Sequence, residues 1–164
     1  MFSEHRYWHG NEPCHQIAYL FNYAGQPWKT QREVRHIMET EYLNAPGGLS
    51  GNDDAGQMSA WYVFSAMGFY PVCPGTPYYI IGSPSFPRMS ICLENGKTFT
   101  ILAHNANEKN VYIQSARLNG KEYDKNYFTH QDIVQGGTLE FQMGPNPNPN
   151  WGASTLSLPP ETMK

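Results

Sequence analysis

The chain has 164 residues, a length that suits one domain or a large piece of one and is enough to bury a core. Its net charge is -3 and its 11 lysine and arginine residues are spread thinly, so no basic stripe is present to neutralise phosphates, and a nucleic-acid partner is not expected. No run of about 18 apolar residues occurs, so the sequence predicts no membrane span. The three cysteines fit neither a disulfide framework nor a zinc knuckle, because they are odd in number and widely spaced.

The first half of the chain contains start and stop signals for three helices. The first is predicted over residues 11–25, where Asn11 can cap an amphipathic pattern that ends at a glycine. The second is predicted over residues 27–41, beginning at a proline and ending before NAPGG. The third follows the loop GGLSGND, with Asp53 or Asp54 as its cap, and a glycine closes it.

The second half changes to short β-branched and aromatic runs that are separated by turn residues. Five strands are predicted from the runs YYIIG, RMSICLE, TFTILAH, NVYIQSARL and TLEFQMG. Asn95-Gly96 and Asn119-Gly120 are hairpin signals, because a type I′ turn needs positive φ at both central positions. We therefore expect a small antiparallel β-sheet.

The coarse plan is an α+β fold in three parts. A helical part covers residues 1–72, a sheet region covers residues 73–145, and an extended tail covers residues 146–164. The tail includes part of GPNPNPNWG, whose alternating prolines cannot enter a regular ladder, so we expect it to lie extended on the surface. Three helices alone enclose a site poorly, which indicates that further helices pack beside them.

The loop LSGNDDAGQ places two adjacent acids, Asp53 and Asp54, at the start of the third predicted helix. The helix macrodipole favours ionised carboxylates there. An ionised carboxylate can cap the helix, which is the commoner use, or it can bind a hard cation or accept a proton from water. An EF-hand is excluded, because the twelfth position counted from Asn52 is Val63 rather than glutamate.

A second polar cluster, HGNEPCHQ, surrounds the start of the first predicted helix. Asn11 and Glu12 offer oxygen ligands of the kind that calcium prefers, while His9 and His15 could line a polar wall or contact a sugar. The alternative reading is a capped helix with one solvated glutamate. Zinc would require a clearer spacing of ligands, such as HExxH.

Two blocks, HGNEPCHQIAYLFNYAGQPWKTQ and GGLSGNDDAGQMSAWYVFSAMGFYPVCPG, resemble signature stretches of glycoside hydrolase family 92. With the strand-rich remainder, the resemblance covers nearly the whole chain. Members of that family are calcium-dependent, inverting exo-α-mannosidases, built from an N-terminal β-sandwich and an (α/α)6 barrel with an associated C-terminal sheet. The resemblance implies that this chain supplies the last helices of the barrel and a small antiparallel β-sheet, and that the substrate is terminal α-linked mannose on glycans.

The resemblance also implies roles for individual residues. Asp54 looks like the general base, with Asp53 assisting it or bonding locally. Asn11 and Glu12 look like calcium ligands, joined by Asp54 directly or through water, and the Ca2+ ion holds sugar hydroxyls. Inversion needs a base and an acid roughly 6.5–9.5 Å apart, which leaves room for a water molecule.

The general acid of that family lies upstream of HGNEP, so we expect the isolated chain to be inactive. Its partners would then be the N-terminal β-sandwich and the remaining barrel helices of a parent enzyme, which is secreted or periplasmic. Two other readings remain open. One is a non-catalytic carbohydrate-binding or scaffolding module whose sheet recognises sugar, and the other is a different (α/α)6 sugar enzyme, such as a phosphorylase.

Overall fold

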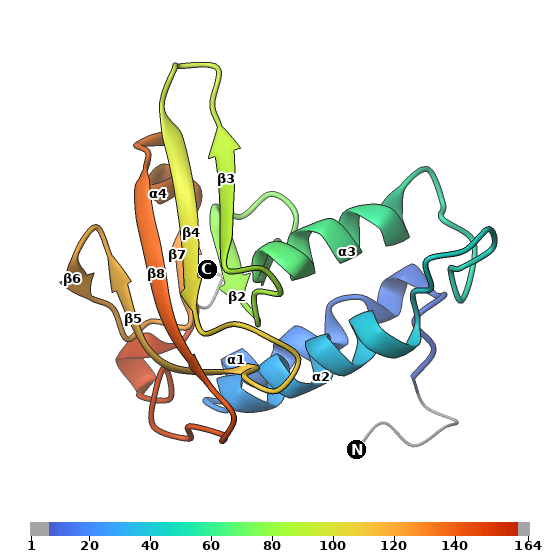
Figure 1. Cartoon of the computed structure of the whole chain (residues 1–164), viewed down its shortest axis with the longest axis horizontal. Helices are drawn as coiled ribbons and strands as arrows, with labels where there is room; N and C mark the ends of the chain where they lie inside the picture. Colours follow the sequence, from blue (N-terminus) through green and yellow to red (C-terminus); the bar gives the residue numbers. More distant parts are fainter. Residues whose placement is uncertain (1–6, 161–164) are drawn as a thin grey trace.

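The computed structural model describes residues 7–160, and it shows a helical part lying beside a sheet part (Figure 1). The helical part contains η1 (Glu12–Cys14), η2 (Ile17–Tyr19), α1 (Leu20–Tyr23), α2 (Pro27–Thr40) and α3 (Gln57–Met67). Within residues 7–160, no helix combines the length and the apolarity needed to cross a bilayer.

The first predicted helix is interrupted, so this prediction was wrong in detail. Two single 3-10 turns are followed by a four-residue α-helix, and Asn11 makes no side-chain cap hydrogen bond. One local and one long-range side-chain bond compete with the helical pattern here. His15 donates from Nε2 to the carbonyl oxygen of His9, and Asn22 donates from Nδ2 to the carbonyl oxygen of Ile81.

The second and third predicted helices are present, and their ends follow from backbone chemistry. Helix α2 begins with proline in its first turn and stops at Glu41. Helix α3 is flanked by two left-handed glycines, Gly56 (φ 95°) and Gly68 (φ 96°). The prediction that an acid occupies the cap position of α3 was wrong, because Gly56 does. Asp53 instead reaches from the preceding loop and accepts a hydrogen bond from the backbone N–H of Ser59 at 2.9 Å.

The strands form two sheets rather than one. They are β1 (Phe69–Tyr70), β2 (Tyr78–Ile81), β3 (Arg88–Cys92), β4 (Thr98–His104), β5 (Tyr112–Leu118), β6 (Lys121–Glu122), β7 (Tyr127–Thr129) and β8 (Gly137–Gly144). A three-stranded sheet has the order β1-β2-β7, and a five-stranded sheet has the order β3-β4-β8-β5-β6. The prediction of a purely antiparallel sheet was wrong, because β4 and β8 run parallel, with Phe99 opposite Gly137. The connection to β8 contains the short helix α4 (His130–Val134).

Only one of the two predicted hairpin turns has the expected conformation. Asn119 and Gly120 both have positive φ, 52° and 79°, as a type I′ turn between β5 and β6 requires. At the other turn, Gly96 has a positive φ but Asn95 does not. That loop is longer, and the Asn95 side chain accepts a hydrogen bond from the backbone N–H of Lys97 at 3.0 Å.

The buried side chains form two clusters. The cluster under the sheets is built on phenylalanine and aliphatic side chains, among them Phe99, Ile101, Leu139 and Phe141. The cluster between the helices and the smaller sheet is richer in tyrosine and tryptophan, among them Tyr19, Trp61 and Tyr70. We call them the sheet core and the helical core.

Residues 146–160 are irregular apart from η3 (Thr155–Ser157), as the alternating prolines predict. They do not lie only on the surface, however. Trp151 is buried in the sheet core, and its indole Nε1 donates to the carbonyl oxygen of Tyr123 at 3.1 Å. This apolar anchor therefore helps to hold a segment that makes no ladder of its own.

Two buried asparagines join the helical part to the rest. Asn22 donates from Nδ2 to the carbonyl oxygen of Asn126 at 2.9 Å, and Asn126 donates back from Nδ2 to the carbonyl oxygen of Asn22 at 3.0 Å. Asn126 also donates to the carbonyl oxygen of Gly152 at 2.7 Å. Helix α1, the strand region and the tail are thus fastened at one point.

Candidate active site

The two polar loops that the sequence singled out meet at a pair of glycines. A Cβ atom added at Gly51 would lie 2.5 Å from Cα of Gly10, and one added at Gly10 would lie 2.9 Å from Cα of Gly51. Real Cβ atoms do not approach other atoms this closely, so the two backbones are in direct contact. The two loops therefore lie side by side at these glycines, from which residues 10–12 and residues 51–54 continue.

The first loop presents oxygen atoms to the surface. Asn11 is exposed and Glu12 is half-buried at the start of η1. The amide nitrogen of Asn11 lies 3.6 Å from Sγ of Cys14. Within the described part of the chain, no hydrogen bond to the Glu12 carboxylate is found, so its lone pairs are available to a ligand.

The second loop holds one acid fixed and leaves the other exposed. Asp53 accepts two hydrogen bonds from Ser59, at 2.9 Å from its N–H and at 3.0 Å from its hydroxyl. Asp54 is exposed, and it begins three consecutive left-handed residues, with φ of 45°, 58° at Ala55 and 95° at Gly56. Left-handed backbone is strained for aspartate and alanine, and such strain persists where the surrounding structure enforces it.

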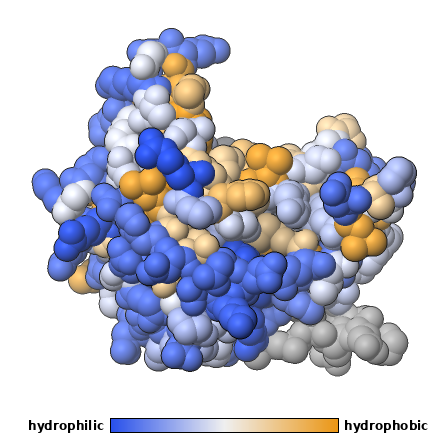
Figure 2. Space-filling model, viewed as in Figure 1, coloured by the Kyte–Doolittle hydropathy of each residue, from blue (hydrophilic) through white to orange (hydrophobic). Residues whose placement is uncertain are grey.

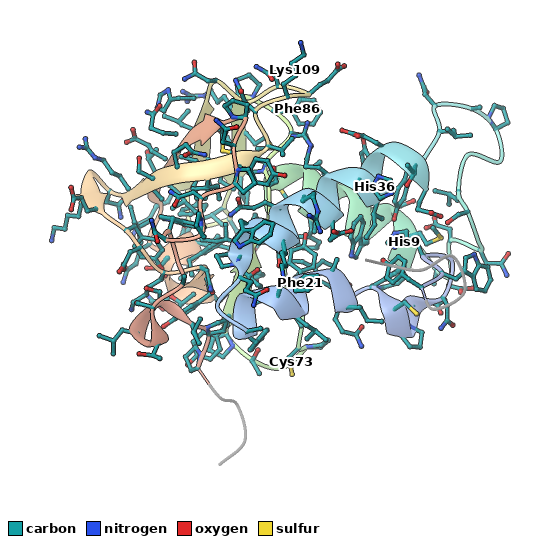
Figure 3. The ribbon with its side chains drawn as sticks, turned by 90° about the horizontal axis from the view of Figure 1, so that it is seen from below. His9, Phe21, His36, Cys73, Phe86 and Lys109 are labelled. Atoms are coloured by element: carbon teal, nitrogen blue, oxygen red, sulfur yellow. The ribbon has the colours of Figure 1, made fainter. Side chains whose placement is uncertain are left out.

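His9 and His15 lie beneath these loops rather than on the surface, with exposed fractions of 0% and 1%. Figure 3 labels His9 at the end of the helical part that lies away from the sheets. The imidazole of His9 contacts the hydroxyls of Tyr7 at 2.8 Å and Tyr42 at 2.6 Å. Burial lowers the pKa of His9 to about 3 and also lowers the pKa of His15, so both rings are neutral near pH 7. A sugar contact by either ring stays a prediction.

The residues predicted as metal ligands, Asn11, Glu12 and Asp54, belong to the two adjoining loops. Their donor atoms are all oxygen, which suits a hard cation such as calcium. Across residues 7–160, however, no three His, Cys, Asp or Glu side chains lie close enough to hold one ion. A calcium site here would need ligands in addition to the side chains of Asn11, Glu12 and Asp54.

Sequence reasoning missed the groups that support the loops. Gly10 and Gly51 each precede an asparagine, in HGN and SGN, and that repeated pair was a usable signal. Gln57 and Tyr42 gave no such signal. Gln57 donates from Nε2 to Nδ1 of His15 at 3.3 Å, whereas Tyr42 bonds to His9, and both contacts depend on the tertiary structure.

Comparison with known proteins gives consistent results. Residues 1–145 match the glycosyl hydrolase family 92 catalytic domain. An uncharacterized secreted glycosidase of Arthroderma benhamiae is 38% identical over 154 residues, which cover 92% of this chain and 20% of that protein.

Two solved structures from Bacteroides thetaiotaomicron are also similar. A family GH92 α-mannosidase in complex with mannoimidazole is 48% identical, with a TM-score of 0.92, and the match covers 96% of this chain and 21% of that one. A family GH92 inverting mannosidase is 46% identical, with a TM-score of 0.89, and the match covers 94% and 21%. The chain thus spans about a fifth of the length of these relatives.

Proposed function

Because the chain belongs to glycosyl hydrolase family 92, we propose that it carries part of the active site of an exo-acting α-mannosidase that releases terminal α-linked mannose with inversion. The relatives described as α-mannosidases, one of them as an inverting mannosidase, support the reaction. The contact between Gly10 and Gly51 is the observation that carries the proposal, because it brings two loops with free oxygen atoms to one place.

Asp54 is the general base in this proposal. A base that takes a proton from water needs a carboxylate with an unoccupied lone pair, and the exposed Asp54 has no hydrogen-bond partner for its carboxylate within residues 7–160. Asp53 assists Asp54 by holding the loop in place and does not itself transfer a proton. Its two bonds to Ser59 anchor the turn from which Asp54 projects.

Calcium is the proposed cofactor, and Asn11, Glu12 and Asp54 would hold it. The donor set fits, since one amide and two carboxylates are oxygen donors of the kind that calcium binds. A bound calcium ion would coordinate sugar hydroxyls and favour distortion of the sugar ring. The remaining ligands would be water, substrate or groups outside these residues.

The chain is proposed to act within a longer, family-sized polypeptide. In Figure 2, apolar surface lies along α3 and the loop beside it, where Val63 is 56% exposed and Leu43 is 68% exposed. Exposed apolar surface of this kind marks a contact with another unit. We propose that the remaining barrel helices cover it, that a β-sandwich and the general acid lie elsewhere on the same polypeptide, and that residues 1–164 alone do not turn over substrate. A secreted or periplasmic location is part of the proposal, and the relative described as a secreted glycosidase supports it.

The test uses the whole polypeptide as its gene encodes it, with an aryl α-mannoside as substrate. Wild type should release mannose whose first-formed anomer is β by proton NMR, and activity should disappear on calcium chelation. Asp54→Asn should lower kcat by about 10²–10⁴-fold, as expected for loss of a general base. The matched control Asp124→Asn changes an exposed acid of the sheet region and should leave kcat unchanged.

Three results would count against the proposal. Full activity of Asp54→Asn would remove the assigned base, and a requirement for phosphate would indicate a phosphorylase. Mannose binding that survives both chelation and Glu12→Ala, without turnover, would favour the carbohydrate-binding module instead.

A further inference from the structure

The buried imidazole of His15 connects the two loops of the candidate site. Its Nε2 lies 2.9 Å from the carbonyl oxygen of His9 in the first loop, and its Nδ1 lies 3.3 Å from Nε2 of Gln57, the first residue of α3. Its own carbonyl oxygen accepts from the indole Nε1 of Trp61 at 3.0 Å. One residue therefore ties the first loop to the helix that follows Asp54.

The chemistry of its partners fixes the protonation state of His15. A carbonyl oxygen only accepts, so Nε2 carries the hydrogen, and an amide nitrogen only donates, so Nδ1 is the acceptor. This is the neutral Nε2–H tautomer. Gln57 uses a second hydrogen of the same amide to donate to the hydroxyl of Tyr70 at 3.0 Å, so its orientation is fixed as well.

His9, whose carbonyl oxygen His15 holds, is fixed in the same way. Its Nε2 lies 2.6 Å from the hydroxyl of Tyr42, which donates its single proton to the carbonyl oxygen of Met58 at 3.0 Å. Tyr42 must therefore accept from Nε2–H of His9. The Nδ1 atom of neutral His9 then accepts from the hydroxyl of Tyr7 at 2.8 Å. The two histidines therefore belong to one hydrogen-bond network, in which the donor and the acceptor of each bond are fixed.

We propose that His15 is a positioning residue, whose neutral imidazole sets the separation between the oxygen donors of Asn11 and Glu12 and the carboxylate of Asp54. The proposal rests on the proposed function of these three side chains. The contact between the loop glycines is a van der Waals contact and gives little direction, whereas the two hydrogen bonds of His15 have preferred angles. Because the ring is 1% exposed and both of its nitrogens are occupied, it acts through the loops and not by touching substrate.

The test compares three substitutions of His15 in the whole encoded polypeptide. Gln can replace the Nε2 donor to the His9 carbonyl, Asn can replace only the Nδ1 acceptor, and Phe replaces neither. Backbone hydrogen exchange of residues 8–12 and 51–56 reports on the loops, and calorimetry with calcium reports on the ligands. We expect His15→Phe to exchange about tenfold faster in both loops and to bind calcium about tenfold or more weakly. His15→Gln should speed exchange mainly in residues 51–56, and His15→Asn mainly in residues 8–12.

Tyr19→Phe is the matched control, since it removes a buried hydrogen bond to Ser65 in the same core without touching either loop. It should lower the melting temperature and leave calcium affinity and loop exchange unchanged. The proposal is overturned if His15→Phe and His15→Asn keep wild-type loop exchange, or if Tyr19→Phe changes the loops equally. If His15→Phe does not fold, the Gln and Asn pair decides. Failure of wild type to bind calcium would refute the calcium part of the proposed function alone, since loop exchange still tests His15.

Discussion

The helical core and the sheet core are held together in different ways. In the sheet core, side chains such as Ile101, Leu139 and Phe141 have no polar atom to satisfy. In the helical core, Tyr19 shares a hydrogen bond with Ser65 at 2.8 Å and Trp61 donates to a carbonyl oxygen. Apolar packing tolerates changes of shape when volume is kept, but buried hydrogen bonds require both distance and direction.

The difference follows from what each core supports. The sheet core supports strands whose own ladders already fix their register. The helical core lies under two irregular loops, which have few backbone bonds to hold them and depend on side chains such as His15 for their positions. Directional bonds therefore support the two loops beside the candidate site, just as they join Asn22 to Asn126 elsewhere in the fold. This comparison can be tested by substitution.

The largest effect is expected from Trp61, which packs in the helical core and also donates a hydrogen bond. Trp61→Ala should lower the free energy of unfolding by about 3–5 kcal/mol, and Phe141→Ala in the sheet core by a similar amount. The milder changes should separate the two cores in urea denaturation. Trp61→Phe leaves a buried carbonyl unpaired and should cost about 1–3 kcal/mol, whereas Phe141→Leu should cost about 1 kcal/mol. Equal costs for the milder pair would contradict the comparison.

The next effect concerns function rather than stability. Gly51→Ala forces the added Cβ against the backbone of Gly10, which cannot give way without moving the loop. We expect kcat/KM on an α-mannoside to fall by about 100-fold, as for a displacement of about 1 Å between reacting groups. Gly144→Ala is the control in the sheet, because the three atoms nearest to its added Cβ, at 2.9–3.1 Å, all belong to the side chain of Gln114 and not to backbone. Equal losses in both variants would show that crowding, and not loop position, matters.

The helical part should also determine how the free energy of unfolding depends on pH, through the buried His9. The pKa of His9 is about 3 in the folded chain and about 6.5 when unfolded, so the unfolded state binds more protons between these values. The stabilisation is complete above pH 6.5, and it is lost on acidification by up to about 1.4 kcal/mol per pH unit. Urea unfolding from pH 7.5 to 5 measures this slope, which His9→Phe should reduce.

The smallest effect is expected where the sheet region does contain a buried polar bond. The hydroxyl of Tyr123 donates to the carbonyl oxygen of Tyr127 at 2.7 Å in a half-buried position. Tyr123→Phe should cost about 1 kcal/mol in thermal unfolding, because water can replace part of the lost bond. Tyr19→Phe, which leaves Ser65 unpaired in a fully buried site, should cost more. The reverse order would show that burial does not govern the difference.

Local signals in the sequence predicted the elements that local chemistry determines. Helix α2 begins at its proline, and Asn119-Gly120 forms the expected turn, because propensity and backbone conformation agree at both places. The parallel pairing of β4 with β8 was missed, since it joins strands that are far apart in the sequence. The helix predicted from residue 11 is interrupted where His15 bonds to the carbonyl oxygen of His9, six residues earlier, and Asn22 bonds to the distant carbonyl oxygen of Ile81.

The candidate site was partly predictable for a related reason. Polar clusters in HGNEP and GNDDAG are visible as residue types, so the loops could be identified. Their contact through Gly10 and Gly51, and the support from Gln57 and Tyr42, arise only when helices fold together. The prediction that Asp53 or Asp54 caps α3 was wrong, because Gly56 is the cap, although Asp53 does accept a hydrogen bond from a backbone N–H of the first turn, at Ser59.

The hydrogen bonds between Asn22 and Asn126 can form only after both residues have been synthesised. Asn22 leaves the ribosome before its partner Asn126, which lies 104 residues later in the chain. At about 5–20 residues per second, synthesis alone separates them by roughly 5–20 s. During that interval the aromatic surface around Trp61 is without the strands that cover it, and a chaperone has time to bind there. Variants that slow pairing of the later strands would lengthen this exposure and reduce the yield of folded protein, even if the helices themselves were unchanged.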